Sequence, residues 1–349
     1  MSSRRPRARV AGIVARLCAL ALLALASAAV AQTVKVDGMP ELRLSTAQGP
    51  AFPLGKAGER WAQLVNEQAG GAFEVKQYPG AVLAARDPGR EFGAVRDGAA
   101  DLAVGSALAW SAQLPAFGAY VLPWLAAEPR EQAALAADAA LFALVAGAAE
   151  RAGVIVVAVA PLGERVVATT RGAVRAPPDL AGLRLRVPAN PLLIETYATL
   201  GARPESLDFA QAQAAFAAGA LDGQDAPPST LAAARAAASG QKFVTRWGAF
   251  ADQMVFAVRR ATWDAWPEAL RAQVRAAAVD AAREAAAASR EDVALADLTR
   301  QGVTIVQLTS AQRAVLRAAV QPVWTKWTGT IGADLVRAAE AAAASATAK

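Results

Sequence analysis

The stretch Asp179-Leu-Ala-Gly-Leu-Arg-Leu-Arg-Val-Pro188 lies in the middle of a 349-residue chain and is the most informative part of the sequence. In an extended chain its three last apolar side chains face one way, while Arg184 and Arg186 face the other. Pro188 ends the strand, so Arg186 stands near its carboxyl end. Ligands bind at the carboxyl ends of strands in open parallel sheets, and a guanidinium there pairs both oxygens of a carboxylate. The spacing alone also fits arginines that are solvated or paired with local acids.

Outward from this stretch, extended segments alternate with helical segments over most of the chain. Alternating residues predict strands at 41–46, 73–78 and 183–187, and further strands are expected at 101–105, 154–160, 166–170 and 253–258. Apolar residues on one face predict a helix at 55–68, and further helices are expected at 91–97, 129–152, 190–200 and 209–218. Strands separated by helices of this length predict an α/β fold with a mostly parallel sheet flanked by helices.

Three further features refine this pattern. The turn-forming Pro161-Leu-Gly163 separates a first series of strands and helices from a second. The alanine-rich segment from about Pro267 to Leu298 predicts one helix of about 45 Å, which exceeds one small lobe and is expected to brace both. Asp208 is the predicted N-cap of the helix that follows it, and Gln211 completes a capping box.

The first 31 residues predict an export signal. Basic residues precede the apolar run from Leu17 to Ala26, and Ala29-Val-Ala31 follows with small residues, as in a secretory signal peptide. A membrane anchor is the alternative, but a span needs about 20 apolar residues and Arg16 interrupts this stretch. We therefore expect cleavage after Ala31 and a mature protein in the periplasm.

Missing residue types exclude most catalytic chemistry. The sequence has no histidine, and its one cysteine, Cys18, lies within the predicted signal. Disulfides, thiolate catalysis, histidine base chemistry and most transition-metal sites are thereby excluded from the mature chain. A nucleophile elbow of the form G-x-S-x-G is also missing from the sequence. We expect no enzymatic activity, no cofactor and no metal.

The charge of the mature chain is close to balance. The full sequence has 36 basic and 30 acidic residues and a net charge of +6. Cleavage after Ala31 removes five arginines and no acids, which leaves a net charge of +1. The calculated basicity therefore gives no support to a nucleic-acid partner, and we expect none.

Several segments together carry a more specific signal. Those in the middle of the chain are Gly163-Glu-Arg165, Asp179 to Pro188, Leu200-Gly-Ala-Arg-Pro204, and Phe209 with Leu221-Asp-Gly-Gln-Asp-Ala-Pro227. Tyr78-Pro-Gly80 and Val95 to Leu102 support them from the first part of the chain. In order and spacing these segments resemble the substrate-binding proteins of tripartite ATP-independent periplasmic (TRAP) transporters, of the DctP type. The resemblance covers about residues 41–335.

The resemblance implies a two-lobed periplasmic solute-binding fold. Each lobe is a mostly parallel sheet flanked by helices, a ligand cleft lies between the lobes, and a long helix spans both. Residues 32–162 plus about 252–291 are expected to form lobe I. Residues 163–251 plus about 292–349 are expected to form lobe II.

The resemblance also implies ligand-binding residues. The main carboxylate-binding arginine of the family falls on Arg186, and a second ligand-contacting arginine falls on Arg165. The aromatic residue that packs on the ligand's carbon skeleton falls on Phe209, whose alternative is core packing beside Phe216. Ser106 lies where sialic-acid receptors of the family carry a carboxylate in the cleft.

One departure from the family pattern affects the expected site. The family usually reads Asp-Gly-Gln-Glu-Asn-Pro, and here residues 222–227 read Asp-Gly-Gln-Asp-Ala-Pro. Ala226 therefore replaces an asparagine that reaches the ligand's carboxylate region, and Gln224 or Asp225 is expected to substitute in part. Asp225 also fits pairing with Arg186, binding of a ligand amine, or an N-cap before the proline.

Together these observations predict an extracytoplasmic receptor. It binds a small organic acid in an interlobe cleft and delivers it to the membrane permease subunits of a TRAP-type transporter. A keto acid, dicarboxylate, sugar acid or aromatic acid would each suit two arginines and a phenylalanine. The alternatives are a receptor for another uptake or signalling system and an exported carboxylate-dependent hydrolase or lyase. We expect the receptor to be a monomer.

Overall fold

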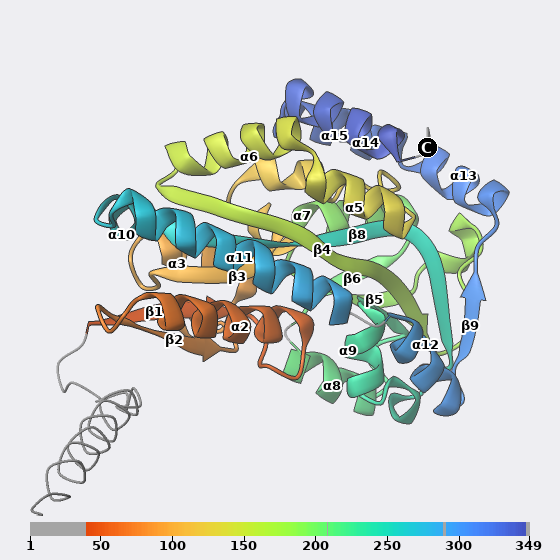
Figure 1. Ribbon diagram of the computed structural model, residues 1–349. Coiled ribbons are helices and arrows are strands. Elements are labelled where there is room, and N and C mark those ends of the chain that lie inside the picture. The colour runs from red at the N-terminus through yellow and green to blue at the C-terminus, as the bar shows by residue number, and fades with distance from the viewer. Residues whose placement is uncertain (1–39, 208, 289–290, 347–349) are drawn as a thin grey trace, which may run out of the picture. The chain divides into compact units, whose positions relative to one another are not determined.

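Two long antiparallel strands, β4 (Val154–Thr169) and β8 (Phe243–Arg259), run through the middle of one sheet (Figure 1). The computed structural model describes residues 40–207, 209–288 and 291–346. At about 3.3 Å per residue each long strand covers about 50 Å, which is long enough to extend through both halves of the sheet. Shorter strands join the long pair at different points along its length.

The sheet order is β2-β1-β3-β8-β4-β7-β5-β6, with β9 beside β8. The first half holds β1 (Glu41–Thr46), β2 (Glu74–Pro79) and β3 (Leu102–Ser106). The second half holds β5 (Arg184–Val187), β6 (Arg203–Ser206), β7 (Gly223–Ala226) and β9 (Thr304–Gln307). Five of the eight strand pairings among the described residues are parallel, so the prediction of a mostly parallel sheet is confirmed.

The first half of the sheet is buried on both faces. On β3, Leu102 and Val104 lie in the core that contains α2 (Pro53–Gln68) and α11 (Glu268–Ala288), whereas Ala103 lies in the core of the opposite face. Because side chains alternate along a strand, a strand covered on both faces is apolar throughout. This explains why the segment around β3 has so few polar residues.

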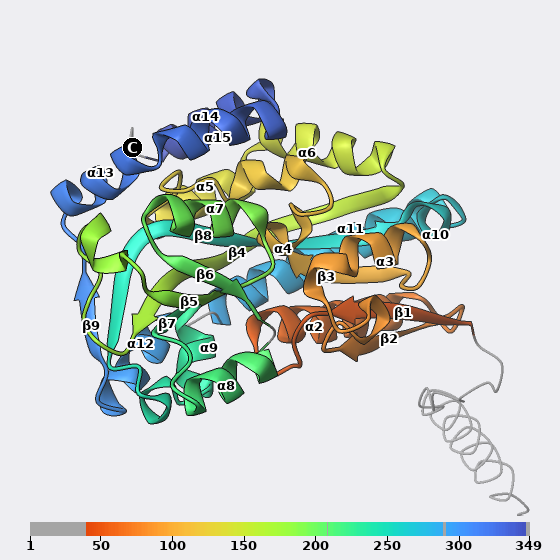
Figure 2. The same ribbon diagram turned by 180° about the vertical axis from the view of Figure 1, so that it is seen from behind.

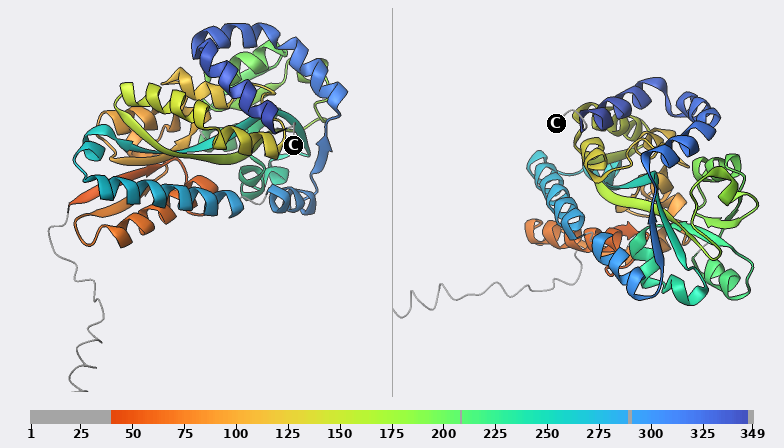
Figure 3. Two further views of the ribbon diagram at one scale, coloured as in Figure 1. Left: turned by 45° about the horizontal axis from the view of Figure 1, so that its top comes forward. Right: turned by 90° about the vertical axis from the view of Figure 1, so that its right-hand side faces the viewer.

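The opposite face carries most of the other helices (Figure 2). From the first part of the chain these are α3 (Glu91–Arg96), α4 (Ala107–Trp110), α5 (Pro129–Ala137), α6 (Ala139–Arg151) and α7 (Pro191–Thr199). The C-terminal helices are α13 (Ser310–Ala319), α14 (Gln321–Ile331) and α15 (Ala333–Ser345). Figure 3 shows these C-terminal helices beside α5 and α6, and α15 contacts both.

The remaining helices serve the ends of the sheet. They are α8 (Phe209–Ala217), α9 (Pro228–Ala233), α10 (Arg260–Asp264) and α12 (Glu291–Arg300). The single brace predicted at 267–298 is described as α11, which packs on α2 and β4, and α12, which packs on α9 and β9. Residues 289–290, between these two helices, lie outside the described residues.

Three predicted strands were wrong in extent. The predicted strands 154–160 and 166–170 form one strand, β4, because Pro161-Leu-Gly163 is absorbed as a register shift rather than a turn. Such a bulge bends a strand without ending its pairing. The predicted strand 253–258 is only the end of β8, which begins ten residues earlier.

The helix predicted at 129–152 was also wrong, because it is two helices bent by 61°. Asp138 separates them, and its side chain accepts a hydrogen bond from the Leu141 amide at 2.7 Å, so it is the N-cap of α6. Among the described residues, no single helix is long and apolar enough to cross a membrane, and α5 with α6 passes that test only as a bent pair.

Some predictions fall on residues outside this description. The export signal at 1–31 and the capping box at Asp208 are among them. The proposed lobe boundaries also stay a prediction.

Candidate functional site

The side chains of β5 alternate as the sequence indicates. Leu185 and Val187 are fully buried, whereas Arg184 and Arg186 are half-buried on the other face. Arg184 forms an ion pair with Asp222, in which Nε lies 2.9 Å from Oδ2. Its hydrogen bonds hold the pKa of the Asp222 carboxyl at about 2. Pairing with a local acid is therefore confirmed for Arg184.

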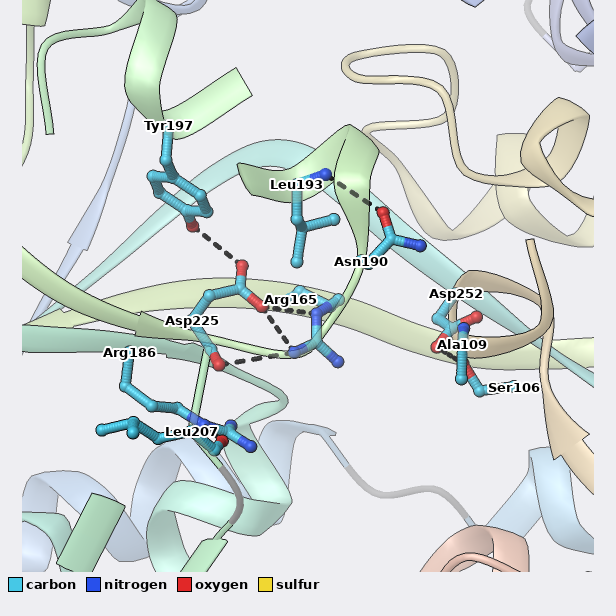
Figure 4. A network of polar contacts seen from close by, with 10 residues as sticks. All are labelled: Ser106, Ala109, Arg165, Arg186, Asn190, Leu193, Tyr197, Leu207, Asp225 and Asp252. Carbon is cyan, nitrogen blue, oxygen red and sulfur yellow. Dashed lines mark hydrogen bonds and ion pairs between the residues drawn. The ribbon is translucent and has the colours of Figure 1, made fainter. Parts of the chain in front are cut away.

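Arg186 lies one residue before the end of β5, where a ligand-binding side chain was expected. Its Nε donates to the backbone carbonyl of Leu207 at 3.0 Å. This contact directs the guanidinium along the edge of the site, toward the side on which Asp252 and Ser106 lie (Figure 4). The position presents a cation at the carboxyl end of the strand.

Arg165 lies on β4 at the point where β7 ends, because the next residue of β4, Val166, pairs with Ala226. Its guanidinium engages Asp225 through Nε and Nη2, at 2.6 and 2.5 Å from Oδ1, and Nη2 also donates to the Asp225 carbonyl at 3.3 Å. Arg165 is 7% exposed and Asp225 is fully buried. The structure therefore brings together two of the predicted site residues, and Asp225 pairs with Arg165 rather than with Arg186.

Tyr197 holds the second oxygen of Asp225. Its hydroxyl donates to Oδ2 at 2.8 Å, and its ring stacks on Trp247 with the ring centres 5.1 Å apart. Burial, with the neighbouring Asp225 charge, raises the pKa of Tyr197 well above its usual value, so the hydroxyl stays protonated and remains a donor. The third nitrogen of Arg165, Nη1, makes no hydrogen bond to any described residue and points out of this cluster (Figure 4).

The other predicted site residues are dispersed. Gln224 precedes Asp225 on β7, so its side chain lies on the opposite face of that strand. Its Nε2 donates a hydrogen bond to Gln241 at 2.9 Å. Ser106 ends β3 and is half-buried. Phe209 is the first residue of α8, and its side chain lies outside the described part of the chain.

Two residues that sequence reasoning missed also line this region. Asp252, on β8, is 2% exposed, and its Oδ2 accepts a hydrogen bond from Ser106 Oγ at 2.5 Å. Asn190, the N-cap of α7, donates from Nδ2 to the Leu108 carbonyl at 2.6 Å and to Ser111 at 2.9 Å. Asn190 is a local N-cap that accepts from the Leu193 amide, but the contacts that join Asn190 to Leu108 and Asp252 to Ser106 span 82 and 146 positions of the sequence.

Electrostatics distinguish these groups. Burial raises the pKa of Asp252, while the hydrogen bond from Ser106 and the charge of Arg165 act in the opposite direction. On the other face of β4, burial raises the pKa of Glu164 to about 7, and Glu164 forms an ion pair with Arg246. Glu164 therefore balances the charge of Arg246 on the other face of β4. The arginines of the candidate site are Arg165 and Arg186.

This arrangement is suited to binding an anion. Arg165, which is buried, and Arg186, which is half-buried, supply charged donors, and such hydrogen bonds are stronger in a buried setting than in water. Within the ranges that the structure describes, no group of three or more Asp, Glu, His or Cys side chains is placed to hold a metal ion.

Comparisons with known proteins give a consistent picture. The family model described as "Bacterial extracellular solute-binding protein, family 7" (DctP) matches residues 44–330. A "Solute-binding protein" of Verminephrobacter eiseniae is 28% identical over 90% of this chain and 91% of its own length.

Solved structures agree with the sequence matches. A TRAP periplasmic solute-binding protein from Ralstonia eutropha, with bound (S)-2-acetolactate, is 41% identical, covers 87% of this chain and 99% of its own, and has a TM-score of 0.83. One from Ochrobactrum anthropi is 27% identical, covers 89% and 96% of the two chains, and has a TM-score of 0.80.

Proposed function

The chain belongs to bacterial extracellular solute-binding protein family 7, the DctP family, and on that premise we propose that Arg186 and Arg165 capture the carboxylate of its solute. The protein is a solute-binding protein of the TRAP type, with the family's two-lobed fold. The observation that carries the proposal is the position of Arg186, a half-buried cation at the carboxyl end of β5.

The two arginines have different roles in the proposal. Arg186 supplies the main contact, because a guanidinium can pair both oxygens of a carboxylate at once. Arg165 is already held by Asp225 and contributes its remaining nitrogen, Nη1. Charged hydrogen bonds contribute about 1.5–3 kcal/mol each, so three of them approach the roughly 8 kcal/mol that micromolar binding requires.

Two of the other predicted site residues, Ser106 and Phe209, remain ligand contacts in the proposal. Ser106 approaches the ligand from the end of β3, and Phe209 packs on its carbon skeleton. We place Gln224 behind the site rather than in it, because its amide is bonded to Gln241. Closure of the two lobes completes the site, and the ligand favours the closed state because only there does it meet both walls.

Export and delivery complete the proposed role. We infer that the signal at residues 1–31 is cleaved after Ala31, and that the mature receptor carries its ligand to the membrane permease subunits of a TRAP transporter. No turnover of the ligand is expected. Support for the ligand class comes from the Ralstonia eutropha relative, which holds (S)-2-acetolactate, a small carboxylate.

The test compares Arg186→Ala with Arg184→Ala. The side chains of both arginines lie on the same face of β5, but Arg184 forms an ion pair with Asp222 and is not proposed to contact the ligand. In calorimetric titration with 2-acetolactate, we expect Arg186→Ala to lose about a hundredfold or more in affinity, since it removes two charged hydrogen bonds. Arg184→Ala should bind as the wild type does. Equal affinity of the Arg186 variant and the wild type would refute the proposal.

A further inference from the structure

Asp252 is a buried carboxylate fixed in one orientation beside the proposed site. Its Oδ1 accepts hydrogen bonds from the backbone amides of Leu108 and Gln253, at 3.0 and 2.8 Å. Its Oδ2 accepts the Ser106 hydroxyl hydrogen at 2.5 Å. Three hydrogen bonds from the protein therefore hold the carboxylate in place.

The strand register directs Asp252 and Arg165 to the same face of the sheet. Arg165 pairs with Phe250 across β4 and β8, and Asp252 follows Phe250 by two residues on the same strand. Since residues two apart on a strand share a face, Asp252 lies beyond Arg165 along the site. Figure 4 shows the guanidinium groups of Arg165 and Arg186 extending toward the side where Asp252 lies.

The charges of these groups limit what the ligand can carry. Asp225 already compensates Arg165, at 2.5–2.6 Å. The proposed function assigns the main carboxylate contact of the ligand to Arg186. A second carboxylate on the same ligand, directed away from the arginines, would approach Asp252. Like charges placed together at a binding interface oppose the wrong partner strongly.

The hydroxyl of Ser106 can accept a hydrogen bond from a ligand but cannot donate one. A hydroxyl has one proton and two acceptor lone pairs. The proton of Ser106 is donated to Asp252, and one lone pair accepts the Ala109 amide at 3.0 Å. Ser106 is half-buried, and its remaining lone pair can only accept a hydrogen bond from a ligand. The wall of the site formed by Ser106 and Asp252 therefore suits a ligand hydroxyl and opposes a carboxylate.

We propose that Asp252, acting directly and through Ser106, is a specificity-determining residue that restricts the site to hydroxy monocarboxylates and rejects dicarboxylates. This inference rests on the proposed function, since it presupposes that the arginines bind a carboxylate. It adds a residue on β8 and a chemical class of ligand.

The substitution Asp252→Asn reverses the hydrogen-bonding character of the wall. The side-chain amide keeps one oxygen for the amides of Leu108 and Gln253, and its NH2 group donates to Ser106. The serine proton is then available to a ligand, and the negative charge is gone. The matched control is Asp101→Asn, because Asp101 is another mostly buried aspartate just before β3, at the opposite end of that strand from Ser106.

The experiment measures affinities for pairs of acids that share a carbon skeleton. These are 2-hydroxybutanoate with malate, 2-hydroxypentanoate with 2-hydroxyglutarate, and the 4-amide of malate with malate, with 2-acetolactate as a further monocarboxylate. We expect the best monocarboxylate to bind the wild type at least about tenfold more tightly than the best dicarboxylate. Asp252→Asn should reduce this ratio to about threefold or less, and Asp101→Asn should keep it.

Ser106→Ala tests the inference without changing the buried charge. It should weaken 2-hydroxypentanoate relative to pentanoate, whereas the rejection of 2-hydroxyglutarate should persist because Asp252 is still present. A dicarboxylate that binds the wild type as tightly as the best monocarboxylate overturns the inference and leaves the proposed function intact. So does a folded Asp252→Asn with the wild-type ratio. If no organic acid binds at all, the proposed function itself fails, and the inference fails with it.

Discussion

Removal of the Asp225 charge should destabilise the fold more than removal of any surface acid. Asp225 is fully buried, and both of its carboxylate oxygens are engaged, one by Arg165 and the other by Tyr197. In Asp225→Asn the amide oxygen can still accept from Arg165, but the NH2 group can only donate to the Tyr197 oxygen, so the tyrosine proton loses its acceptor. Arg165, which is 7% exposed, then has no described counter-ion bonded to it.

The size of the effect follows from this burial. Removing one partner of a buried ion pair costs about 3–5 kcal/mol, because the remaining charge stays desolvated. The loss from Asp225→Asn should lie near the lower end, about 3 kcal/mol, since one hydrogen bond survives. At about 2–3 °C per kcal/mol, the melting temperature should fall by about 6–9 °C.

Urea unfolding of the ligand-free protein measures this loss. Tryptophan fluorescence follows unfolding, and Trp247, one of the eight tryptophans, stacks on Tyr197 in this cluster. The control is Asp280→Asn, whose ion pair with Arg283 is exposed, with side chains that are 48% and 76% exposed. Because solvent screens that pair, the control should lose at most about 1 kcal/mol. A loss below 1 kcal/mol for Asp225→Asn, or a larger loss for the control, would refute the assignment of Asp225 as the buried counter-ion.

Two further predictions concern the core of the first half of the sheet. Burial raises the pKa of Glu91 from 4.5 to about 8, so the folded state keeps a proton that the unfolded state releases. The unfolding free energy should therefore fall by about 3–5 kcal/mol between pH 4.5 and 8, and urea titrations of Glu91→Gln should lack this decline. Gly105→Ala places a methyl group 2.3 Å from the Trp110 ring and should cost about 1–3 kcal/mol, whereas Gly172→Ala, with no atom within 4 Å, should be nearly neutral in the same assay; equal losses contradict the packing argument.

Local patterns predicted what depends on local geometry. The alternation of 183–187 places Leu185 in the core and Arg186 at the carboxyl end of β5, as the structure confirms. The alternation typical of strands and the spacing typical of helices were also sufficient to predict an α/β fold with a mostly parallel sheet. Failures occurred where tertiary pairing overrides a local signal. Pro161 and Gly163 are typical turn residues, but β8 pairs with β4 on both sides of them, and the strand continues as a bulge.

The charge pattern of the site was beyond local reasoning. Arg165 and Asp225 are sixty residues apart, and Ser106 and Asp252 are 146 apart, so no periodicity relates them. Asp252 also sits in a strand whose neighbours are almost all buried, where a carboxylate is unexpected. The β4–β7 register places Asp225 next to Arg165, and the β4–β8 register places Asp252 on the same face as Arg165, so only the tertiary pairing of these strands relates the two acids.

The pairing of Arg165 with Asp225 also explains how a receptor keeps a buried arginine before its ligand arrives. An uncompensated guanidinium at 7% exposure would cost several kcal/mol in the empty protein. Asp225 removes that cost, and Tyr197 holds its other oxygen so that the acid stays in place. The same compensation reduces what Arg165 can offer an anion, because Nε and Nη2 are already engaged. Carboxylate capture should therefore depend mainly on Arg186, which is half-buried and costs less to desolvate, so that Asp225 governs stability and Arg186 governs affinity.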